Sequence, residues 1–566
     1  MRVATDAADA ETLLAAVPAN QRVAVVDARF VGHVHALRLG LTDPRFDAAA
    51  IPGAVTARPA ARPALTRALR TASDDASNGS VVVGILAERI AEVLDTDLYR
   101  PELGELVAEV PRDPQSRNEA RQAVTVVDDE AIRLRTAVKS RDGFFTTYCI
   151  SPYSRYLARW CARRGFTPNQ VTTASLITAL IAAGCAATGT RAGYVAAGLL
   201  LLFSFVLDCT DGQLARYSLQ YSTLGAWLDA TFDRAKEYAY YAGLALGAAR
   251  GGDDVWALAL GAMVLQTCRH VVDFSFNEAN HDATANTSPT AALSGRLDSV
   301  GWTVWLRRMI VLPIGERWAM IAVLTAVTTP RITFYVLLIG CAFAATYTTA
   351  GRVLRSLTRK ATRTDRAARA LADLADSGPL ASFVARVSPA RLGAPFLIAL
   401  AGTAVLVATL FSGAAWAPVA GAFVYAIAAG QALSHPLKGS LDWLVPPLFR
   451  AAEYCTVLIL AAEAEVNGAL PAAFGLVAAV AYHHYDTVYR IRGNAGASPA
   501  WLVRAIGGHE GRTLLVTVLA AALTASQFPV ALTVLAVAVA LLVLVESIRF
   551  WVSAGAPAVH DEGEPA

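Results

Sequence analysis

From Val171 onward, apolar segments follow one another with short polar breaks, and this succession constrains the fold more than any other feature. Charged residues make up 17% of the 566 residues and hydrophobic residues 55%, against about 25% and about 45–50% in an average soluble domain. About 20 apolar residues suffice for a helix to cross a bilayer. We therefore predict an all-α polytopic membrane protein behind a soluble N-terminal part. The apolar runs lie near 171–188, 193–214, 224–249, 255–276, 314–329, 332–351, 396–412, 417–433, 447–463, 469–484, 513–526 and 529–548.

Several of these runs are short for a span, so the predicted number of twelve spans has a margin of one or two. The loops that would face outward contain three basic residues, Arg191, Arg250 and Arg331, whereas segment 352–395 alone contains nine. Positive loops stay inside. Residues 1–20 also lack a basic stretch followed by an apolar run. We expect a multi-pass protein of the cell (plasma) membrane with both termini in the cytoplasm.

Residues 1–145 have the pattern of a small soluble α/β domain. Strand-like runs at 23–28, 80–86 and 123–127 alternate with helical stretches such as 87–94. The domain contains neither GxGxxG nor GxxxxGK[ST], so the simplest interpretation is a regulatory or vestigial domain.

Segment 150–164 is predicted to form an amphipathic helix that lies in the membrane interface. An ordinary surface helix is the alternative, and the span that follows favours the interface. The apolar side would carry Tyr153, Tyr156, Leu157, Trp160 and Cys161, and the other side Arg155, Arg159 and Arg163.

Four aspartates form the most informative pattern. Asp208 and Asp211 are three residues apart, and Asp229 and Asp233 are four apart, so each pair shares a helix face. Both pairs fall at the cytoplasmic ends of consecutive predicted spans, and the short turn between these spans brings the pairs together. Ionisable residues at a membrane boundary are costly and mark functional sites. Carboxylate oxygens suit Mg²⁺ or Mn²⁺, which in turn can hold a pyrophosphate.

The complete pattern reads Asp208-x-x-Asp211-Gly212-x-x-Ala215-Arg216, then eight residues, then Gly225-x-x-x-Asp229-x-x-x-Asp233. It resembles the signature of the CDP-alcohol phosphotransferases, also called CDP-alcohol phosphatidyltransferases. The resemblance covers about residues 145–355. It implies a core of six spans that transfers a phosphoalcohol from a CDP-alcohol to an acceptor hydroxyl and releases CMP, in phospholipid or inositol-phosphate lipid biosynthesis.

The resemblance also implies a role for each residue of the pattern. Asp208, Asp211 and Asp229 would be metal ligands, and Asp233 would be both a ligand and the general base. Two Mg²⁺ (or Mn²⁺) ions are expected. The expected CDP contacts are Asn169, Thr172, Gly212, Ala215, Arg216, Ser222 and Gly225.

The substrates are less constrained. Several basic residues would suit a phosphorylated polyol acceptor such as inositol phosphate, although positive-inside anchoring explains them equally well. These residues are Arg234, Lys236, Arg269 and Arg352. The donor is either CDP-diacylglycerol or a soluble CDP-polyol. Segment 128–145 weakly resembles the domain junction of bifunctional inositol-phosphate enzymes, so residues 1–145 would be a degenerate nucleotidyltransferase-like domain.

The second half of the membrane region repeats features of the first. The sequence Arg-Ala-Lys-Glu-Tyr at 234–238 is followed 216 positions later by Arg-Ala-Ala-Glu-Tyr at 450–454, and Gly212-Gln213 by Gly430-Gln431. We predict a diverged copy of the six-span unit that lacks the metal site, because Ala426 and Ala429 stand at the positions of Asp208 and Asp211. The family resemblance implies a homodimer, for which this copy would be an internal substitute. Chance similarity between Ala/Leu-rich helices is the alternative.

The expected organisation has five parts. They are a soluble α/β domain at 1–145, the phosphotransferase membrane domain at 146–355, a basic cytoplasmic linker at 356–390, a second six-span membrane domain at 391–552 and a flexible tail at 553–566. Expected partners are the CDP-alcohol, the acceptor and membrane lipid, with no nucleic acid. The alternatives in function are a twelve-span transporter, whose two halves would suit alternating access, and an inactive scaffold.

Overall fold

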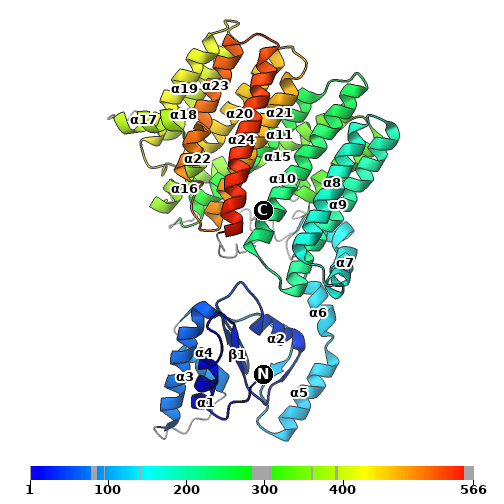
Figure 1. Cartoon of the computed structure of the whole chain (residues 1–566), viewed down its shortest axis with the longest axis vertical. Coiled ribbons are helices and arrows are strands. Elements are labelled where there is room, and N and C mark those ends of the chain that lie inside the picture. Colours follow the sequence, from blue (N-terminus) through cyan, green and yellow to red (C-terminus); the bar gives the residue numbers. More distant parts are fainter. Residues whose placement is uncertain are drawn as a thin grey trace.

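The computed structural model describes residues 2–77, 86–94, 96–139, 142–283, 305, 309–358, 361–388 and 393–553. A small domain with strands lies at one end of the molecule, and a long helical region forms the rest (Figure 1). Within the described residues, strands occur only before residue 110. The predicted fold class, an all-α membrane region behind a small α/β domain, is confirmed.

The N-terminal domain is built on a sheet of order β1-β4-β3-β5, in which β4 pairs antiparallel with β1 and β3, and β3 pairs parallel with β5. The short strands β2 and β6 form a second pair. These strands are β1 (Val23–Val26), β2 (Val31–Gly32), β3 (Ala48–Ile51), β4 (Ala54–Ala57), β5 (Leu98–Tyr99) and β6 (Ala108–Glu109). The helices around them are α1 (Ala7–Ala15), α2 (Val34–Leu41), α3 (Arg62–Ser77), α4 (Leu86–Val93) and a 3₁₀ turn (Pro59–Ala61).

The strand predicted at 23–28 and the helix at 87–94 are confirmed as β1 and α4. Residues 80–85 of the run 80–86 lie outside the described residues. The strand predicted at 123–127 is wrong, because these residues end α5 (Pro114–Val126). Asp113 and Ser116 form a capping box at its start, with proline in the first turn, and such caps favour a helix over the β-branched preference of its last residues.

Between the two parts, α6 (Asp129–Thr136) and a π-helical turn (Thr146–Ile150) lead into α7 (Ser151–Arg163). The predicted amphipathic helix at 150–164 is confirmed as α7. Its small side chains, such as Ser154 and Ala158, are buried against α9, while Tyr153, Tyr156 and Trp160 are about half exposed. Exposed aromatic rings beside arginines suit a membrane interface.

The membrane region contains two sets of long helices, each of which coincides with one of the predicted apolar runs. The first unit is α8 (Pro168–Ala187), α9 (Arg191–Ser218), α10 (Thr223–Arg250), α11 (Trp256–Asn280), α14 (Ile314–Val327) and α15 (Pro330–Thr358). The second unit is α18 (Pro395–Leu410), α19 (Ala417–Leu433), α20 (Val445–Glu463), α21 (Ala469–Arg492), α23 (Gly508–Ala522) and α24 (Gln527–Ser553).

Of the helices in the described part of the chain, five are long and apolar enough to cross a membrane. They are α8, α9, α15, α24 and the stretch Asp442–Glu463, which joins a 3₁₀ turn (Asp442–Leu444) to α20. The apolar helices α18 and α19 are shorter. Helix α10 has the length of a span, but its first half contains the charged residues of the site, which lower its hydropathy.

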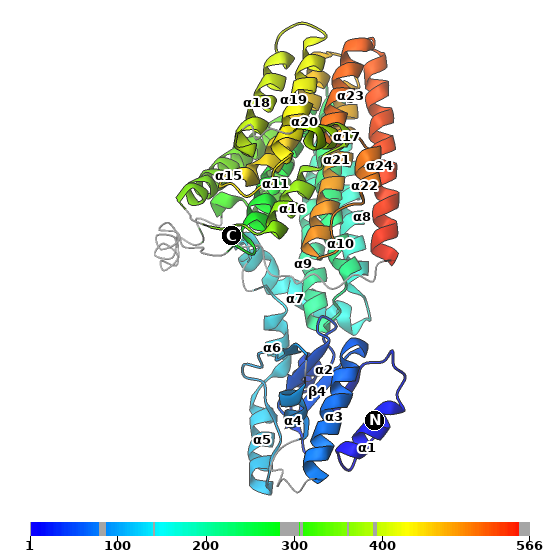
Figure 2. The same cartoon turned by 90° about the vertical axis from the view of Figure 1, so that its left-hand side faces the viewer.

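The helices pack in the same order in both units, and the two units lie side by side beyond the N-terminal domain (Figures 1 and 2). In the first unit α8 packs on α9 and α10, α9 on α14, and α11 on α15; in the second, α18 packs on α19 and α20, α19 on α23, and α21 on α24. The amphipathic helix α7 packs on α9, and α17 (Pro379–Val387) packs on α19. The units meet where α10 and α11 contact α20 and α21. Helices α16 (Asp365–Ala375) and α22 (Ala500–Ala505) complete the second half.

Two glycines let α10 approach α8 closely. A Cβ atom on Gly243 would overlap the backbone carbonyl of Ala183, and one on Gly247 would overlap that of Ala186. Small residues four apart are the usual means by which membrane helices pack backbone to backbone. The contact fixes α10, and with it the aspartates in its first half.

Candidate active site

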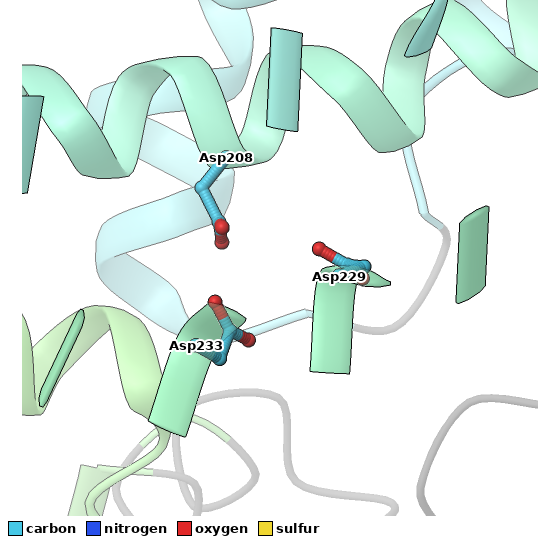
Figure 3. A group of neighbouring side chains, drawn as sticks. All are labelled: Asp208, Asp229 and Asp233. Atoms are coloured by element: carbon cyan, nitrogen blue, oxygen red, sulfur yellow. The ribbon is translucent and has the colours of Figure 1, made fainter. Parts of the chain in front are cut away.

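Asp208 on α9 and Asp229 and Asp233 on α10 point toward one another (Figure 3). One carboxylate oxygen from each lies within 4.8 Å of the others. The two helices are joined by a short turn in which Leu219 has a left-handed backbone (φ 54°), and Ser222 caps α10 by accepting a hydrogen bond from the Gly225 N–H. The turn places the end of α9 beside the start of α10, as the motif spacing predicts.

Asp211 lies one turn further along α9 and is buried. Its Oδ2 accepts no hydrogen bond from any residue that the structure describes. A buried carboxylate oxygen of this kind is costly unless a cation or donor reaches it. Asp211 lies outside the group of three whose carboxylate oxygens are within 4.8 Å of one another.

Lys236, one of the residues predicted to contact the acceptor phosphate, lies between two of the aspartates. Its ammonium is fully buried and forms ion pairs with Asp208 and with Asp233, the latter at 2.8 Å between Nζ and Oδ1. It also donates to the Ser175 hydroxyl at 3.2 Å. In this structure its ammonium is therefore occupied by the acidic cluster. The spacing of three residues from Asp233 is the sequence signal for this contact.

The donor set fits a divalent cation. The cluster contains three carboxylates, two of which pair with the Lys236 ammonium, so the three acids outnumber this one basic group. All the donors are hard oxygen atoms, which suit Mg²⁺ or Mn²⁺. The uncompensated Oδ2 of Asp211 points to the same chemistry.

Four of the predicted nucleotide contacts lie where the starts of α8 and α10 are side by side. A Cβ atom on Gly225 would lie 2.8 Å from both Asn169 Oδ1 and Ser222 Oγ. Thr172 is buried one turn into α8, and its hydroxyl donates to the Pro168 carbonyl at 3.0 Å. A larger residue at 225 would require the Asn169 or Ser222 side chain to move.

The other predicted contacts lie near the end of α9. The Arg216 Nε donates to the carbonyl of Ala137 at 2.6 Å, which ties the arginine to the segment after α6. A Cβ atom on Gly212 would lie 3.4 Å from the Arg216 guanidinium. Ala215 precedes Arg216 on the same helix and is partly buried.

The four basic residues predicted to bind the acceptor do not form one cluster. Arg234 follows Asp233, lies 3.5 Å from Glu237, and has its guanidinium 5.0 Å from the ring centroid of Tyr485. Arg269 is buried and donates to the Val311 carbonyl. Arg352 forms an ion pair with Asp273.

Sequence reasoning missed Glu237. Both of its oxygens bind the Arg317 guanidinium, at 2.9 and 3.0 Å, and the Tyr241 hydroxyl donates to it at 2.6 Å. This buried pair fastens α10 to α14 behind the aspartates. Its signal was present in the repeated pattern Arg-x-x-Glu-Tyr, in which the glutamate is kept in both halves.

With the geometry described, the chain can be compared with known proteins. Residues 166–346 match the family described as CDP-alcohol phosphatidyltransferase, and they contain all four aspartates and the turn between α9 and α10. Residues 166–346 belong to the CDP-alcohol phosphatidyltransferase family. Residues 365–566 match a family of unknown function (DUF5941). The phosphatidyltransferase family and the apolar helices make the chain a membrane protein.

The phosphatidyltransferase region is similar to several curated proteins. One is a bifunctional IPC transferase and DIPP synthase of Aquifex aeolicus, 31% identical over 114 residues, which are 20% of this chain and 26% of that protein. Another is a phosphatidylinositol phosphate synthase of Streptomyces avermitilis, 32% identical over 130 residues, 22% of this chain and 51% of that protein. A third is an archaetidylinositol phosphate synthase of Pyrococcus horikoshii, 29% identical over 113 residues, 20% and 58% of the two lengths. The chain thus spans between 26% and 58% of the lengths of these relatives.

Proposed function

We propose that residues 146–355 transfer a phosphoalcohol group from a CDP-alcohol to an acceptor hydroxyl and release CMP, in phospholipid or inositol-phosphate lipid biosynthesis. The observation that carries the proposal is the convergence of Asp208, Asp229 and Asp233 from two helices inside the region that matches the phosphatidyltransferase family. A transporter or scaffold has no need of this acidic cluster, so neither alternative is favoured.

Asp208, Asp211, Asp229 and Asp233 would hold two Mg²⁺ (or Mn²⁺) ions. When bound, such ions neutralise the charge of a pyrophosphate. The chain itself supplies Lys236, whose buried ammonium holds Asp208 and Asp233 at a fixed separation. The nucleotide would lie along Asn169, Thr172, Gly212, Ala215, Arg216, Ser222 and Gly225, in the space that the glycines leave open.

Asp233 would be the general base. It stands where α10 faces α9, and the ion pair with Lys236 at 2.8 Å orients its carboxylate. In the proposed step, Asp233 removes the proton of the acceptor hydroxyl, the hydroxyl oxygen attacks the phosphorus distal to cytidine, and CMP leaves from the opposite side.

The acceptor would be a phosphorylated polyol such as inositol phosphate, with Arg234, Arg269 and Arg352 as the basic residues available for its phosphate. Two relatives named as inositol phosphate lipid synthases support this class.

The second unit contains an arginine at the matching position that binds an anionic group. Arg450, the counterpart of Arg234, binds the buried Asp376 carboxylate at 2.9 Å, and Arg512 binds the same oxygen at 2.8 Å. An arginine at this helix position is thus suited to hold an anion.

We further propose that the protein resides in the plasma membrane with both termini in the cytoplasm. The basic segment 352–395 supports this orientation. Residues 1–145 would form a separate cytoplasmic domain, 356–390 the linker, 391–552 the second membrane domain and 553–566 a tail.

A CMP-release assay on membranes that contain the full chain tests the function. CDP-diacylglycerol and CDP-inositol are offered as donors, each with inositol phosphate, glycerol phosphate and free inositol as acceptors. We expect CMP release with at least one pair, its loss in EDTA, and its recovery with Mg²⁺ or Mn²⁺.

Asp233→Asn keeps the shape of the base but removes its charge, so we expect CMP release to fall by at least 10²-fold, the lower end of a general base's contribution. The control is Asp253→Asn, which alters a carboxylate paired with Arg331 beyond the far end of α10. Full turnover by Asp233→Asn would refute its role, and no CMP from any pair would refute the function.

A further inference from the structure

The two units share a set of buried ion pairs as well as a packing order. In the first, Arg317 on α14 binds Glu237 on α10 at 2.9 Å between Nε and Oε1; in the second, Arg512 on α23 binds Glu453 on α20 at 2.6 Å through the same atoms. The arginine three residues before each glutamate also binds it, Arg234 at 3.5 Å and Arg450 at 2.9 Å. Chance similarity between apolar helices does not produce matching buried pairs.

The helices that precede the two units are held in the same way. Glu316, at the start of α14, accepts a hydrogen bond from the Phe145 N–H at 3.2 Å, just before α7. Glu510, at the start of α23, accepts hydrogen bonds from the Gly378 and Ala381 N–H groups at 3.0 Å, at the start of α17. A glutamate at the start of α14 or α23, one residue before Arg317 and two residues before Arg512, thus fastens the preceding segment in both units.

The second unit keeps this framework but lacks the site charges. At spacings of 216 and 218 positions, the counterparts of Asp208, Asp211, Asp229, Asp233 and Lys236 are Ala426, Ala429, Val445, Phe449 and Ala452. All five replacements are apolar and buried. The loss of the lysine together with the four acids indicates that Lys236 belongs to the same functional group. The anion position beside Arg450 and Arg512 is filled by Asp376 of the chain itself.

The second unit also reaches the surroundings of the first unit's site. Tyr485 on α21 lies with its ring centroid 5.0 Å from the Arg234 guanidinium, and its hydroxyl lies 2.6 Å from His270 Nδ1 on α11. Trp551 on α24 stacks on Trp227 of α10, with ring centroids 5.9 Å apart and 20° between the planes. Both contacts fall on the stretch of α10 that contains Asp229 and Asp233.

We propose that residues 365–553 are a catalytically inert second copy of the phosphatidyltransferase unit that acts as an internal partner of the first, and that Tyr485 is a positioning residue for Arg234. The ring holds the guanidinium, which also lies 3.5 Å from Glu237, by a cation–π contact, and His270 fixes the ring through its hydroxyl. The part of the inference that concerns Arg234 rests on the proposed function, because it assigns this arginine to the acceptor phosphate.

Steady-state kinetics of the full chain test the role of Tyr485. In Tyr485→Leu and Tyr485→Gln the ring is lost, and we expect the KM for the phosphorylated acceptor to rise roughly tenfold, the effect of losing one desolvated cation–π contact. The KM for the CDP-alcohol and kcat should change less than about twofold, because uniform binding of one substrate is what is removed. Tyr485→Phe keeps the ring but loses the hydroxyl that contacts His270, so we expect a rise in the acceptor KM that is smaller than in Tyr485→Leu.

Tyr482→Leu is the matched control, since Tyr482 lies on the same helix but donates to Ser547 on α24 within the second unit. Thermal unfolding of each variant in detergent shows whether it is folded. An unchanged acceptor KM in both Tyr485→Leu and Tyr485→Gln, or an equal rise in Tyr482→Leu, would overturn the positioning role.

The inertness of the second unit is measured without substrate, by titration of the full chain with Mn²⁺. We expect the double variant Asp208→Asn/Asp229→Asn to lose all Mn²⁺ binding tighter than millimolar. Binding that survives in this variant would show a metal site elsewhere and overturn the inert copy. A wild-type chain that binds Mn²⁺ but releases no CMP would instead refute the proposed function and leave this result standing.

Discussion

Lys236 places a buried positive charge between two carboxylates that are expected to bind metal. In the absence of a cation, Asp208 and Asp233 would repel each other in a site with little water, and the ammonium offsets that repulsion. The lysine therefore stabilises the site before it is loaded. Its positive charge also reduces the net negative charge of the cluster to which a cation would bind.

We predict that Lys236→Met destabilises the metal-free protein by about 3–5 kcal/mol, the usual cost of removing one partner of a buried ion pair. The stabilisation by Mn²⁺ should be larger in the variant than in wild type, because more uncompensated charge is neutralised. Thermal unfolding in EDTA and in Mn²⁺ measures both. Lys438→Met is the control, since Lys438 forms an exposed pair with Asp365 at 2.7 Å. Equal unfolding temperatures of Lys236→Met and wild type in EDTA would contradict the prediction.

At this scale the sequence predicts the aspartates but not all of their neighbours. The spacing of Asp208, Asp229 and Asp233 is a property of single helices and one turn, so it can be read directly. The partners of Lys236 and Arg352 depend on how α9, α10, α11 and α15 pack. Helix spacing alone does not distinguish a lysine that faces a ligand from one that faces Asp208.

The packing of α10 on α8 brings residues of both helices together at the site. Gly243 and Gly247 bring the two backbones together, and Asn169 and Thr172 at the start of α8 then lie next to the start of α10. The nucleotide contacts and the aspartates share this single helix pair, so its separation affects both.

Gly247→Ala should destabilise the protein by about 1–3 kcal/mol, the typical cost of overpacking, because the new methyl group meets the rigid backbone of Ala186. Gly184→Ala on α8 is the matched control, since a Cβ atom there meets nothing within 4 Å. We expect the control to be neutral or slightly stabilising, as alanine favours helix more than glycine. Equal unfolding temperatures for the two variants in nanodiscs would show that the close approach of α10 to α8 does not contribute to the stability of the protein.

The long helices were predictable because each is a sustained apolar run. The strand predicted at 123–127 was wrong because the prediction gave weight to the β-branched residues there. In the structure, the helix that is capped at Asp113, ten residues earlier, continues through them. The aromatic side of α7 was correctly placed on one face, but its arginines also approach the N-terminal part of the chain. Arg159 and Arg163 lie 3.9 and 3.8 Å from Glu130 on α6.

Across the whole molecule, the N-terminal domain contacts the end of α9 next to the site. Arg38 donates to the Ser218 carbonyl at 3.3 Å and Arg133 to that of Tyr217 at 2.8 Å, while the Tyr217 hydroxyl donates to Glu130 at 2.8 Å. These contacts hold the last turn of α9 and lead into the turn that ends at Ser222. Sequence patterns within either part do not reveal such contacts, because they join segments up to 180 residues apart.

His35 lies beneath these contacts, and burial together with the positive charges of Arg133 and Arg38 lowers its pKa to about 4, against weaker opposing effects of Asp129 and Glu130. The unfolded chain, with a histidine pKa of about 6.5, then binds more protons between these values. The stability of the N-terminal domain should be full above about pH 6.5 and decline as the pH falls toward 4.

Hydrogen exchange of α2, β3 and β4 across this pH range measures the effect. His35→Phe should flatten the pH dependence, because it removes the group that must be protonated on unfolding. His281→Phe, at an exposed position after α11, should keep the wild-type slope. A wild-type slope in His35→Phe would show that other groups are responsible.

The two units contact each other through α10, α11, α20 and α21 within one chain, and this affects which amino-acid substitutions can accumulate during evolution. In a symmetric dimer every substitution occurs twice, so a residue that improves one copy as a support also alters the copy that reacts. Two units on one chain are free of this constraint. Position 449 can be phenylalanine while position 233 is aspartate. One gene then encodes both the unit with the acidic cluster and the unit that supports it.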